Sequence, residues 1–392
     1  MTRAERIAFV VPRWSREGTV GGAENLLGSL ARRAAAQRDV EVLTTCARNH
    51  FTWANEREPG SETVDGLTVR YFRVNEDRDL ERFLDVQEQI SHGVEISDEE
   101  ERDWIDHNVN SRDLLDHLTD STYDTVVIGP YLFGLTWHAS GIHPGRTFLV
   151  PCLHAEPFAQ LRIMHRMFAQ VRGFLFNSVP ERELARRLFG LRDARIGVVG
   201  MGLESFEADA GAFARRHNLT QPYVIYSGRR EPLKGTPMLL DFVHGFRRRT
   251  RIDLKLVLTG SGEFDAPAGL RPHIIDAGIL PEKEKQEAMA GAVAFLHPSV
   301  NESLSIVILE AWLAGTPCLV TAFSDVMQYQ CLQSGGGLWF QTYPEFEEQL
   351  NRLIQDTELR ATLARRGRAF VRQQYNWNAV EKRFYDVIDG GR

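Results

Sequence analysis

Two carboxylates with a fixed spacing stand out in the C-terminal third of the chain. Glu302 and Glu310 form an E-x7-E pattern within residues 297–321, HPSVNESLSIVILEAWLAGTPCLVT. The residues between them are apolar on nearly every face, which is typical of a helix buried inside a layered fold. The segment contains no Lys or Arg. Because an unpaired buried charge is costly, we expect each carboxylate to face a cleft and to have a polar partner.

The start of this helix is suited to an anion. We expect the helix to begin near Ser305 and Ile306, where free backbone N–H groups and the positive end of the helix dipole favour negative charge. Glu310 lies roughly 7.5 Å further along at the rise of an α-helix. This distance suits a sugar nucleotide with its diphosphate at the helix start and its ribose diol accepted by Glu310. Glu302 would then face the sugar.

A basic loop supplies the complementary charge. The segment SGRREPLKG (227–235) follows an apolar strand and contains Arg229 and Lys234. A guanidinium group can donate two hydrogen bonds to phosphate oxygens, and an ammonium group adds a point charge. Together they would stabilise the charge that grows on a departing diphosphate. A basic surface turn before a helix is the alternative interpretation.

The surrounding pattern of strands and helices indicates two α/β domains with parallel sheets whose faces are covered by helices. At 392 residues the chain is too long for one ordinary core. We predict a first series of strands at 7–12, 40–45, 67–74, 124–130, 147–154, 173–178 and 195–202. We predict a second series at 223–229, 254–260, 273–278, 294–299, 318–321 and 337–340.

The two motifs resemble the donor site of a known family. The stretch 298–317 reads PS-x-x-E-S-x-S-I-x-x-L-E-A-x-x-x-G-x-P, and 228–235 reads G-R-x-x-x-x-K-G. Both resemble retaining GT-B glycosyltransferases of family 4, the glycosyl transferases group 1. The resemblance implies two Rossmann-like doubly wound domains that face a central cleft. Residues 1–203 would bind the acceptor, residues 204–372 would bind the nucleotide-sugar donor, and a helix in 373–392 would cross back onto the first domain.

The resemblance also implies roles for individual residues. A sugar would move from a nucleotide-diphosphate donor to an acceptor hydroxyl with retention, and the leaving phosphate would deprotonate the acceptor without a metal or other cofactor. His154 ends a strand, where ligands of doubly wound sheets bind, although a structural role for this histidine is about equally expected. The residues implied in catalysis are Glu302, His154, Arg229 and Lys234. Those implied in donor binding are Gly21, Gly22, Arg229, Lys234, Gly260, Ile279, Ser303, Leu304, Ser305, Ile306 and Glu310.

The chain departs from the family motif in the loop after Glu302, which bears on the identity of the donor sugar. Many relatives have Gly-Phe-Gly or Pro-Phe-Gly after the first Glu, whereas this chain has Ser303-Leu304-Ser305. The reaction class is unaffected, but the donor sugar cannot be inferred from this loop.

Three other functions remain open at this stage. A sugar-nucleotide epimerase of the same fold would need an acid–base pair that the sequence does not reveal. A nicotinamide dehydrogenase would need the G-x-G-x-x-G fingerprint, which is absent. A non-catalytic sugar-nucleotide-binding module would not need Arg229, Lys234 and Glu302. The D-x-D pattern at Asp77 and Asp79 opens a charged helical stretch, and we do not interpret it as a metal site.

Composition limits the partners. The net charge is 46 − 53 = −7, which argues against nucleic acid. The four cysteines are scattered and suggest no metal site. No apolar run is long enough to span a membrane, and the N-terminus lacks the pattern of a signal peptide, so we expect a cytoplasmic protein. The segment 159–172 is a basic amphipathic helix that could lie on the inner face of an anionic membrane or pack on the sheet.

The acceptor is the least defined part of the prediction. Residues 79–118 are acidic and helical, and Ser97 with Glu100 predicts a capping box at a helix start. We interpret this segment as a solvated insertion, and the alternative is that it shapes the acceptor entrance. Carbohydrate, lipid-linked and small-molecule acceptors all remain open. The corresponding pathways are cell-surface polysaccharide, lipopolysaccharide or natural-product glycoside biosynthesis.

Overall fold

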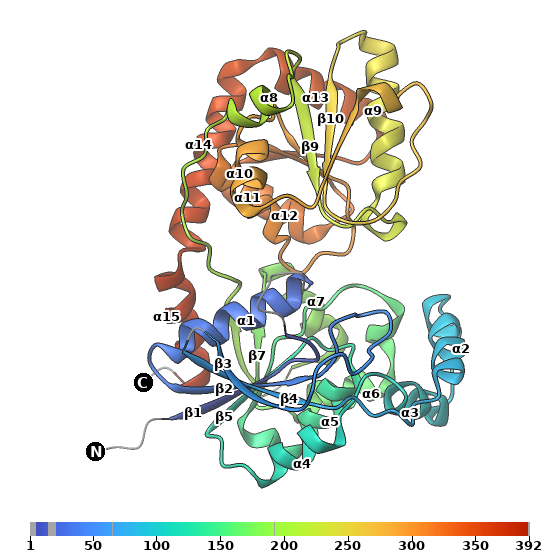
Figure 1. Ribbon diagram of the computed structural model, residues 1–392, viewed down its shortest axis with the longest axis vertical. Coiled ribbons are helices and arrows are strands. Elements are labelled where there is room, and N and C mark those ends of the chain that lie inside the picture. Colours follow the sequence, from blue (N-terminus) through green and yellow to red (C-terminus); the bar gives the residue numbers. More distant parts are fainter. Residues whose placement is uncertain (1–4, 15–20, 65, 192, 391–392) are drawn as a thin grey trace. The chain divides into compact units, whose positions relative to one another are not determined.

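The computed structural model divides the chain into two units, shown in Figure 1. The first unit comprises residues 1–201 together with 380–392, and the second comprises residues 202–379. The structure describes residues 5–14, 21–64, 66–191 and 193–390. Residues 15–20, which precede Gly21, lie outside this description.

The first unit is built on an eight-stranded sheet with the order β3-β4-β2-β1-β5-β6-β7-β8. All neighbours are parallel except β3 and β4, which are antiparallel. The strand order reverses at β1, the position where doubly wound sheets bind ligands beyond the carboxyl ends of their strands. The strands are β1 (Arg6–Val10), β2 (Asp39–Thr45), β3 (Gly60–Val64), β4 (Leu67–Phe72), β5 (Thr125–Ile128), β6 (Thr147–Leu149), β7 (Gly173–Phe176) and β8 (Arg195–Val198).

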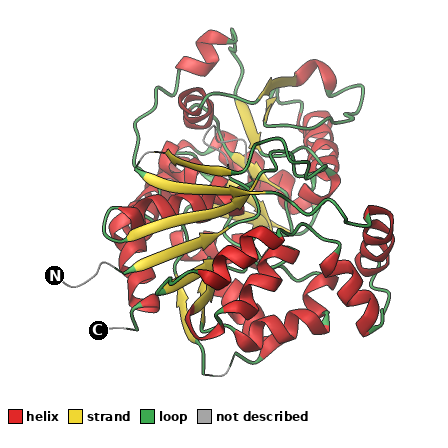
Figure 2. Cartoon of the chain, turned by 60° about the horizontal axis from the view of Figure 1, so that its bottom comes forward, coloured by secondary structure: helices red, strands yellow, loops and turns green. Residues whose placement is uncertain are grey.

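Helices surround this sheet, as Figure 2 shows. Their apolar faces and the strands bury one continuous core that includes Trp104, Tyr131, Phe168 and Phe174. The last helix returns to the first unit from Val380 onward. The helices are α1 (Gly22–Ala35), α2 (Leu80–Ser91), α3 (Asp98–Asp106), α4 (Arg112–Asp120), α5 (Gly134–Ile142), η1 (Pro144–Arg146), η2 (Pro157–Gln160), α6 (Arg162–Gln170), α7 (Val179–Phe189) and α15 (Trp377–Ile388).

The second unit contains a six-stranded sheet with the order β11-β10-β9-β12-β13-β14. All of its strand pairs are parallel, and the order reverses at β9. The strands are β9 (Tyr223–Ser227), β10 (Lys255–Thr259), β11 (Ile274–Gly278), β12 (Phe295–His297), β13 (Cys318–Thr321) and β14 (Gly337–Phe340). The helices are α8 (Ala212–Arg216), η3 (Pro232–Lys234), α9 (Thr236–Thr250), η4 (Arg271–His273), α10 (Glu282–Ala290), α11 (Ile306–Ala314), α12 (Asp325–Ser334), α13 (Tyr343–Gln355) and α14 (Thr357–Gln374).

The prediction of two doubly wound α/β domains is confirmed, and three local predictions were wrong. The first sheet is not wholly parallel, because the exposed polar strand β3 pairs antiparallel with β4 at its edge. The strand predicted at 147–154 ends at Leu149. The helix predicted at 159–172 is shorter, since a 3-10 turn, η2, precedes α6.

The acidic insertion of the first unit is helical, as predicted. It forms α2, α3 and α4. Ser97 and Glu100 form the capping box expected at the start of α3, in which each side chain accepts from the other residue's backbone N–H. Across the described residues, no helix has both the length and the apolar composition needed to cross a bilayer.

Candidate functional site

At the carboxyl ends of β9, β10 and β11, the backbones of neighbouring strands approach one another closely. A Cβ atom on Gly260, which follows β10, would lie 2.1 Å from the carbonyl oxygen of Gly228, which follows β9. Gly260 also has a φ of 116°, which other residues rarely adopt. Its N–H donates to the carbonyl of Gly278 at the end of β11 (2.7 Å). The backbones of the three strand ends are therefore in direct contact, which glycine at 260 permits.

A partly buried ion pair lies at the carboxyl ends of these strands. Nζ of Lys234, at the end of η3, lies 2.8 Å from Oε1 of Glu302, in the loop before α11. Nε2 of His297, the last residue of β12, lies 3.4 Å from the same oxygen. Burial alone would raise the pKa of Glu302, but the interactions with His297 and Lys234 outweigh it and hold the pKa well below its usual range. Glu302 is therefore a carboxylate at neutral pH.

Gly235 explains how Lys234 reaches Glu302. Gly235 has a φ of 72° and precedes α9. A Cβ atom there would lie 2.6 Å from the carbonyl oxygen of Pro298. Because only glycine permits both the left-handed turn and this close approach, the K-G pair brings the lysine against the loop that contains the first carboxylate.

The two arginines of the basic loop have different surroundings. The side chain of Arg229 is 53% exposed and lies 3.4 Å from Glu231. The side chain of Arg230 is only 8% exposed, pairs with Asp276 of β11 and donates to the carbonyl of Gly260 (3.1 Å). Arg230 thus stabilises the joined strand ends, and Arg229 is available to a ligand.

The start of α11 has an unusual conformation. Ser305 has a φ of 58°, in the left-handed region that residues other than glycine seldom adopt. Its buried hydroxyl has no hydrogen-bond partner among the described residues, and it does not cap the helix. The preceding carbonyl, of Leu304, accepts from Nε2 of Gln330. An unused hydroxyl therefore lies at the N-terminus of α11, where the first backbone N–H groups of a helix have no partner one full turn earlier in the chain.

Glu310 has a partner that the sequence analysis did not identify. Its Oε1 lies 3.0 Å from Nζ of Lys285 in α10, which also lies 2.9 Å from Glu282. Its Oε2 is buried and has no partner among the described residues. Burial raises the pKa of Glu310, and the charge of Lys285 opposes this shift. One carboxylate oxygen is therefore fixed by the lysine and the other is left to accept a further hydrogen bond.

The predicted site residues fall into two groups. Arg229, Lys234, Gly260, Ile279, the stretch 303–306, Glu302 and Glu310 all belong to the second unit. Within this group the structure joins Lys234 to Glu302, whereas Glu310 pairs with Lys285 instead. Ile279 follows β11 and is 72% exposed.

Gly21, Gly22 and His154 belong to the first unit. Nδ1 of His154 lies 3.6 Å from Oε1 of Glu156, which also accepts from the hydroxyl of Tyr131 (2.6 Å). A Cβ atom on Gly21 would lie 2.6 Å from Oε2 of Glu24, so glycine at 21 leaves room for that carboxylate. Glu24 in turn pairs with the buried Arg13 (3.1 Å).

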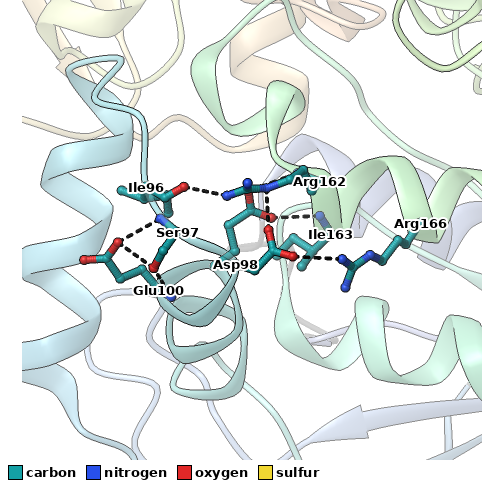
Figure 3. A network of polar contacts seen from close by, with 8 residues as sticks. Ile96, Ser97, Asp98, Glu100, Arg162, Ile163 and Arg166 are labelled. Atoms are coloured by element: carbon teal, nitrogen blue, oxygen red, sulfur yellow. Dashed lines mark hydrogen bonds and ion pairs between the residues drawn. The ribbon is translucent and has the colours of Figure 1, made fainter.

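Two other sequence features have structural roles. In the D-x-D pattern, Asp77 pairs with Arg112, and Asp79 caps α2 by accepting from the N–H of Arg82 (2.9 Å). The cations Arg162 and Arg166 of α6 both pair with Asp98 of α3, as Figure 3 shows. The basic face of α6 is therefore largely neutralised by α3, and contact with a membrane stays a hypothesis.

Comparison with known proteins places the site in a family. Residues 209–370 match the family model described as glycosyl transferases group 1. An uncharacterized glycosyltransferase of Methanocaldococcus jannaschii is 25% identical over 175 residues, which cover 42% of this chain and 44% of that protein. The chain thus spans less than half of this relative. A D-inositol 3-phosphate glycosyltransferase of Jonesia denitrificans is 24% identical over 92% of this chain and 89% of that protein.

Comparison with solved structures identifies the fold. HepE of Anabaena, solved in complex with UDP-glucose, superposes with a TM-score of 0.72 at 16% identity, over 98% of this chain and 99% of that chain. At this identity the likeness concerns the fold alone. Residues 209–370 therefore resemble the glycosyl transferases group 1 family, and the chain has the GT-B fold.

Proposed function

We propose that this protein transfers a sugar from a nucleoside diphosphate donor to an acceptor hydroxyl, with retention of the anomeric configuration. The observation that carries the proposal is the contact of Lys234 with Glu302 (2.8 Å) just before α11. It places a cation and a carboxylate beside a helix N-terminus, at the end of β12, the strand next to the point where the order of the sheet reverses.

The donor would use three parts of this site. Its diphosphate takes hydrogen bonds from the first N–H groups of α11 and from the free hydroxyl of Ser305, with the charge of Arg229 nearby. Its ribose diol donates to Oε2 of Glu310, which Lys285 holds from the other side. Gly260 and the exposed Ile279 follow neighbouring strands and would accommodate the nucleotide base.

The chemistry then depends on charge rather than on a protein nucleophile. As the bond to the diphosphate breaks, negative charge grows on the leaving phosphate, and Arg229 and Lys234 stabilise it. The phosphate takes the proton of the acceptor hydroxyl, which attacks on the same face of the sugar. Glu302 orients Lys234 and the sugar. We propose that no metal takes part, and the proposed role of His154 beside the sugar stays a prediction.

The acceptor remains open between a carbohydrate, a lipid-linked and a small-molecule hydroxyl compound. The relative from Jonesia denitrificans is named for inositol 3-phosphate, and this gives one candidate to assay. The epimerase and the non-catalytic module are the rival functions. The mass of the product separates transfer from epimerisation, and turnover separates both from a binding module.

The decisive experiment is thermal stabilisation of the full chain by UDP, GDP, TDP, ADP, CDP and NAD. We expect one diphosphate to raise the melting temperature and Glu310→Ala to abolish most of the shift, since losing a hydrogen-bonded carboxylate costs about 1–3 kcal/mol. Stabilisation by NAD alone, or by none of the six compounds, would overturn the proposal. Once the donor is known, NMR of the product establishes the anomeric configuration.

A further inference from the structure

A pocket lies in the first unit, and its lining includes none of the residues proposed to bind the donor. This pocket of about 650 Å³ lies between the end of α2, the loop into α3, and the segment that contains η2 and the start of α6. Its volume is in the range of about 300–1,000 Å³ that is typical of small-molecule sites. Apolar side chains dominate its lining: Ile90, Val94, Ile96, Leu161 and Leu184.

The walls of the pocket are fixed by hydrogen bonds across the chain. The carboxylate of Glu101, in α3, accepts from the backbone N–H groups of Arg162 (3.1 Å) and Ile163 (2.9 Å). It thereby caps α6, whose own N-cap residue Leu161 offers no polar side chain. Nη2 of Arg162 donates to the carbonyl of Ile96 (2.5 Å), as Figure 3 shows. The pocket is therefore formed before any ligand arrives.

An aromatic stack joins the same elements. Trp104 of α3 is buried and stacks on Phe83 of α2 and on Phe158 of η2, with ring centroids 6.3 Å and 5.4 Å apart. The acidic insertion is thus packed against the body of the unit rather than projecting into solvent.

The charge of the pocket selects among ligands. Its lining includes the carboxylates of Glu95, Glu101 and Glu156 and a single cation, Arg162. Arg162 lies 3.0 Å from Glu101 and 2.7 Å from Asp98, so its charge is already compensated. The remaining field is negative, and an anionic group would be repelled.

Glu156 gives the pocket a polar end. The hydroxyl of Tyr131 and Nδ1 of His154 both approach Oε1 of Glu156, whereas the described residues form no hydrogen bond to Oε2. Burial would raise the pKa of Glu156, but the interactions with His154 and Tyr131 outweigh burial and lower the pKa below its ordinary value. This carboxylate is therefore ionised at neutral pH. Oε2 can therefore accept a hydrogen bond from a ligand hydroxyl inside the pocket.

We propose that this pocket binds the acceptor, and that the acceptor is an uncharged hydroxyl compound with a compact apolar body. The apolar body packs between Ile90, Val94 and Leu184, and a hydroxyl donates to Oε2 of Glu156, the residue that also contacts His154. Acceptors with a phosphate, sulfate or carboxylate in the pocket are disfavoured. This proposal rests on the proposed glycosyltransferase function, because only that function requires an acceptor.

Two fluorescent probes with the same apolar body test it. 4-Methylumbelliferyl β-D-glucoside is neutral and bears hydroxyls, and 4-methylumbelliferyl phosphate is anionic. We expect the full chain to bind the glucoside at least about tenfold more tightly than the phosphate in fluorescence titrations, a ratio that corresponds to about 1.4 kcal/mol. Equal affinities, or tighter binding of the phosphate, would overturn the proposal.

Matched variants locate the binding. Val94 lines the pocket and is 51% exposed, so Val94→Asp should leave the fold intact and weaken glucoside binding about tenfold. Leu84, on α2 but outside the pocket lining, is 57% exposed and serves as the control, so Leu84→Asp should bind like the parent chain. Glu156→Gln should reduce the ratio between the affinities for the glucoside and for the phosphate. Equal loss in the two aspartate variants would place the probe elsewhere and overturn the assignment.

The result can be separated from that of the nucleotide experiment. If a nucleoside diphosphate stabilises the chain but the glucoside does not bind, the pocket assignment fails and the proposed function stands. If the glucoside binds at the pocket but no nucleotide stabilises the chain, the pocket stands as a binding site and its role as an acceptor site fails with the proposed function.

Discussion

Nζ of Lys234 lies 2.8 Å from Oε1 of Glu302, although the two residues are 68 positions apart in the sequence. Lys234 belongs to the loop that follows the first strand of its sheet, and Glu302 to the loop after β12. Because β9 and β12 are neighbours, the two loops emerge side by side. The fold of the second unit thus assembles a cation–carboxylate pair from two separate motifs.

Separating this pair should be costly. Lys234→Met would leave the mostly buried carboxylate of Glu302 with His297 as its one ion-pair partner among the described residues. We expect a loss of about 1–3 kcal/mol in the free energy of unfolding. Glu302→Gln added to Lys234→Met should recover part of that loss, because the uncompensated charge disappears. Urea denaturation of the single and double variants measures the coupling. If the losses in unfolding free energy of the two single variants add up to that of the double variant, the contact between Lys234 and Glu302 does not stabilise the fold.

The tight turn before α9 should be intolerant of a side chain. Gly235→Ala adds a Cβ atom 2.6 Å from the carbonyl oxygen of Pro298 in a residue with a φ of 72°, and we expect a loss of about 2–4 kcal/mol in unfolding free energy from strain and displacement. Gly278→Ala is the matched control, since Gly278 has a φ of 59° but nothing within 4 Å of the added atom. It should lose only about 1–2 kcal/mol. Similar losses in the two variants would argue against the contact with Pro298.

Lys285 should act on nucleotide binding through Glu310. Lys285→Gln removes the cation that lies 3.0 Å from Oε1 of Glu310. Burial raises the pKa of Glu310 and the charge of Lys285 opposes this, so the variant has a carboxyl group that is protonated more readily and accepts hydrogen bonds from the ribose less well. We expect the dissociation constant of the preferred diphosphate to rise about five- to thirtyfold, which corresponds to about 1–2 kcal/mol. Isothermal titration calorimetry measures this change. Lys283→Gln, at an exposed position of the same helix, should have no effect, and a comparable loss there would refute a specific role for Lys285.

Glu181 should make stability depend on pH. Its carboxyl group in α7 is fully buried and lies within hydrogen-bond distance of the N–H groups of Leu153 (2.7 Å) and Asn177 (2.5 Å). Burial raises the pKa to about 8, against the opposing effect of these N–H groups. Between the ordinary carboxyl range and about pH 8 the folded chain therefore holds a proton that the unfolded chain has released. The free energy of unfolding should fall as pH rises across this interval.

Denaturation at several pH values between 5 and 8 tests this dependence. Glu181→Gln cannot ionise and should flatten the profile, whereas Glu183→Gln, at an exposed carboxyl group of the same helix, should preserve it. A parent chain whose stability does not change over this range would contradict the assignment.

The features of the fold that depend on local sequence pattern could be predicted from the sequence. The alternation of apolar runs with helical periodicity correctly indicated two doubly wound domains, and the capping box at Ser97 was visible as a motif. β3 was missed because its exposed, polar residues contain no apolar alternation. Its position at the sheet edge depends on pairing with β4, which a single segment does not reveal.

The site was predicted less completely than the fold. The motifs identified Lys234, Glu302 and Glu310 from their spacing, but not their partners. Lys285 occurs in a charged run, EKEKQE, that has the appearance of a solvated helix face. Only the packing of α10 beside α11 places it against Glu310. Likewise, the neighbouring Arg229 and Arg230 have the same chemistry, but the first is exposed beside Glu231 and the second is buried against Asp276.

The first unit is assembled from two separate lengths of chain, and this has a consequence for biosynthesis. Phe384 of α15 stacks on Phe9 of β1 with ring centroids 6.2 Å apart, and Arg195 of β8 donates to the carbonyl of Ile388 (2.9 Å). Residues 380–392 leave the ribosome after the whole of the second unit. The first unit must therefore keep the surfaces of β1 and β8 that contact α15 uncovered until translation has passed Ile388 and α15 has left the ribosome. During that interval these surfaces are the part of the molecule most in need of a chaperone.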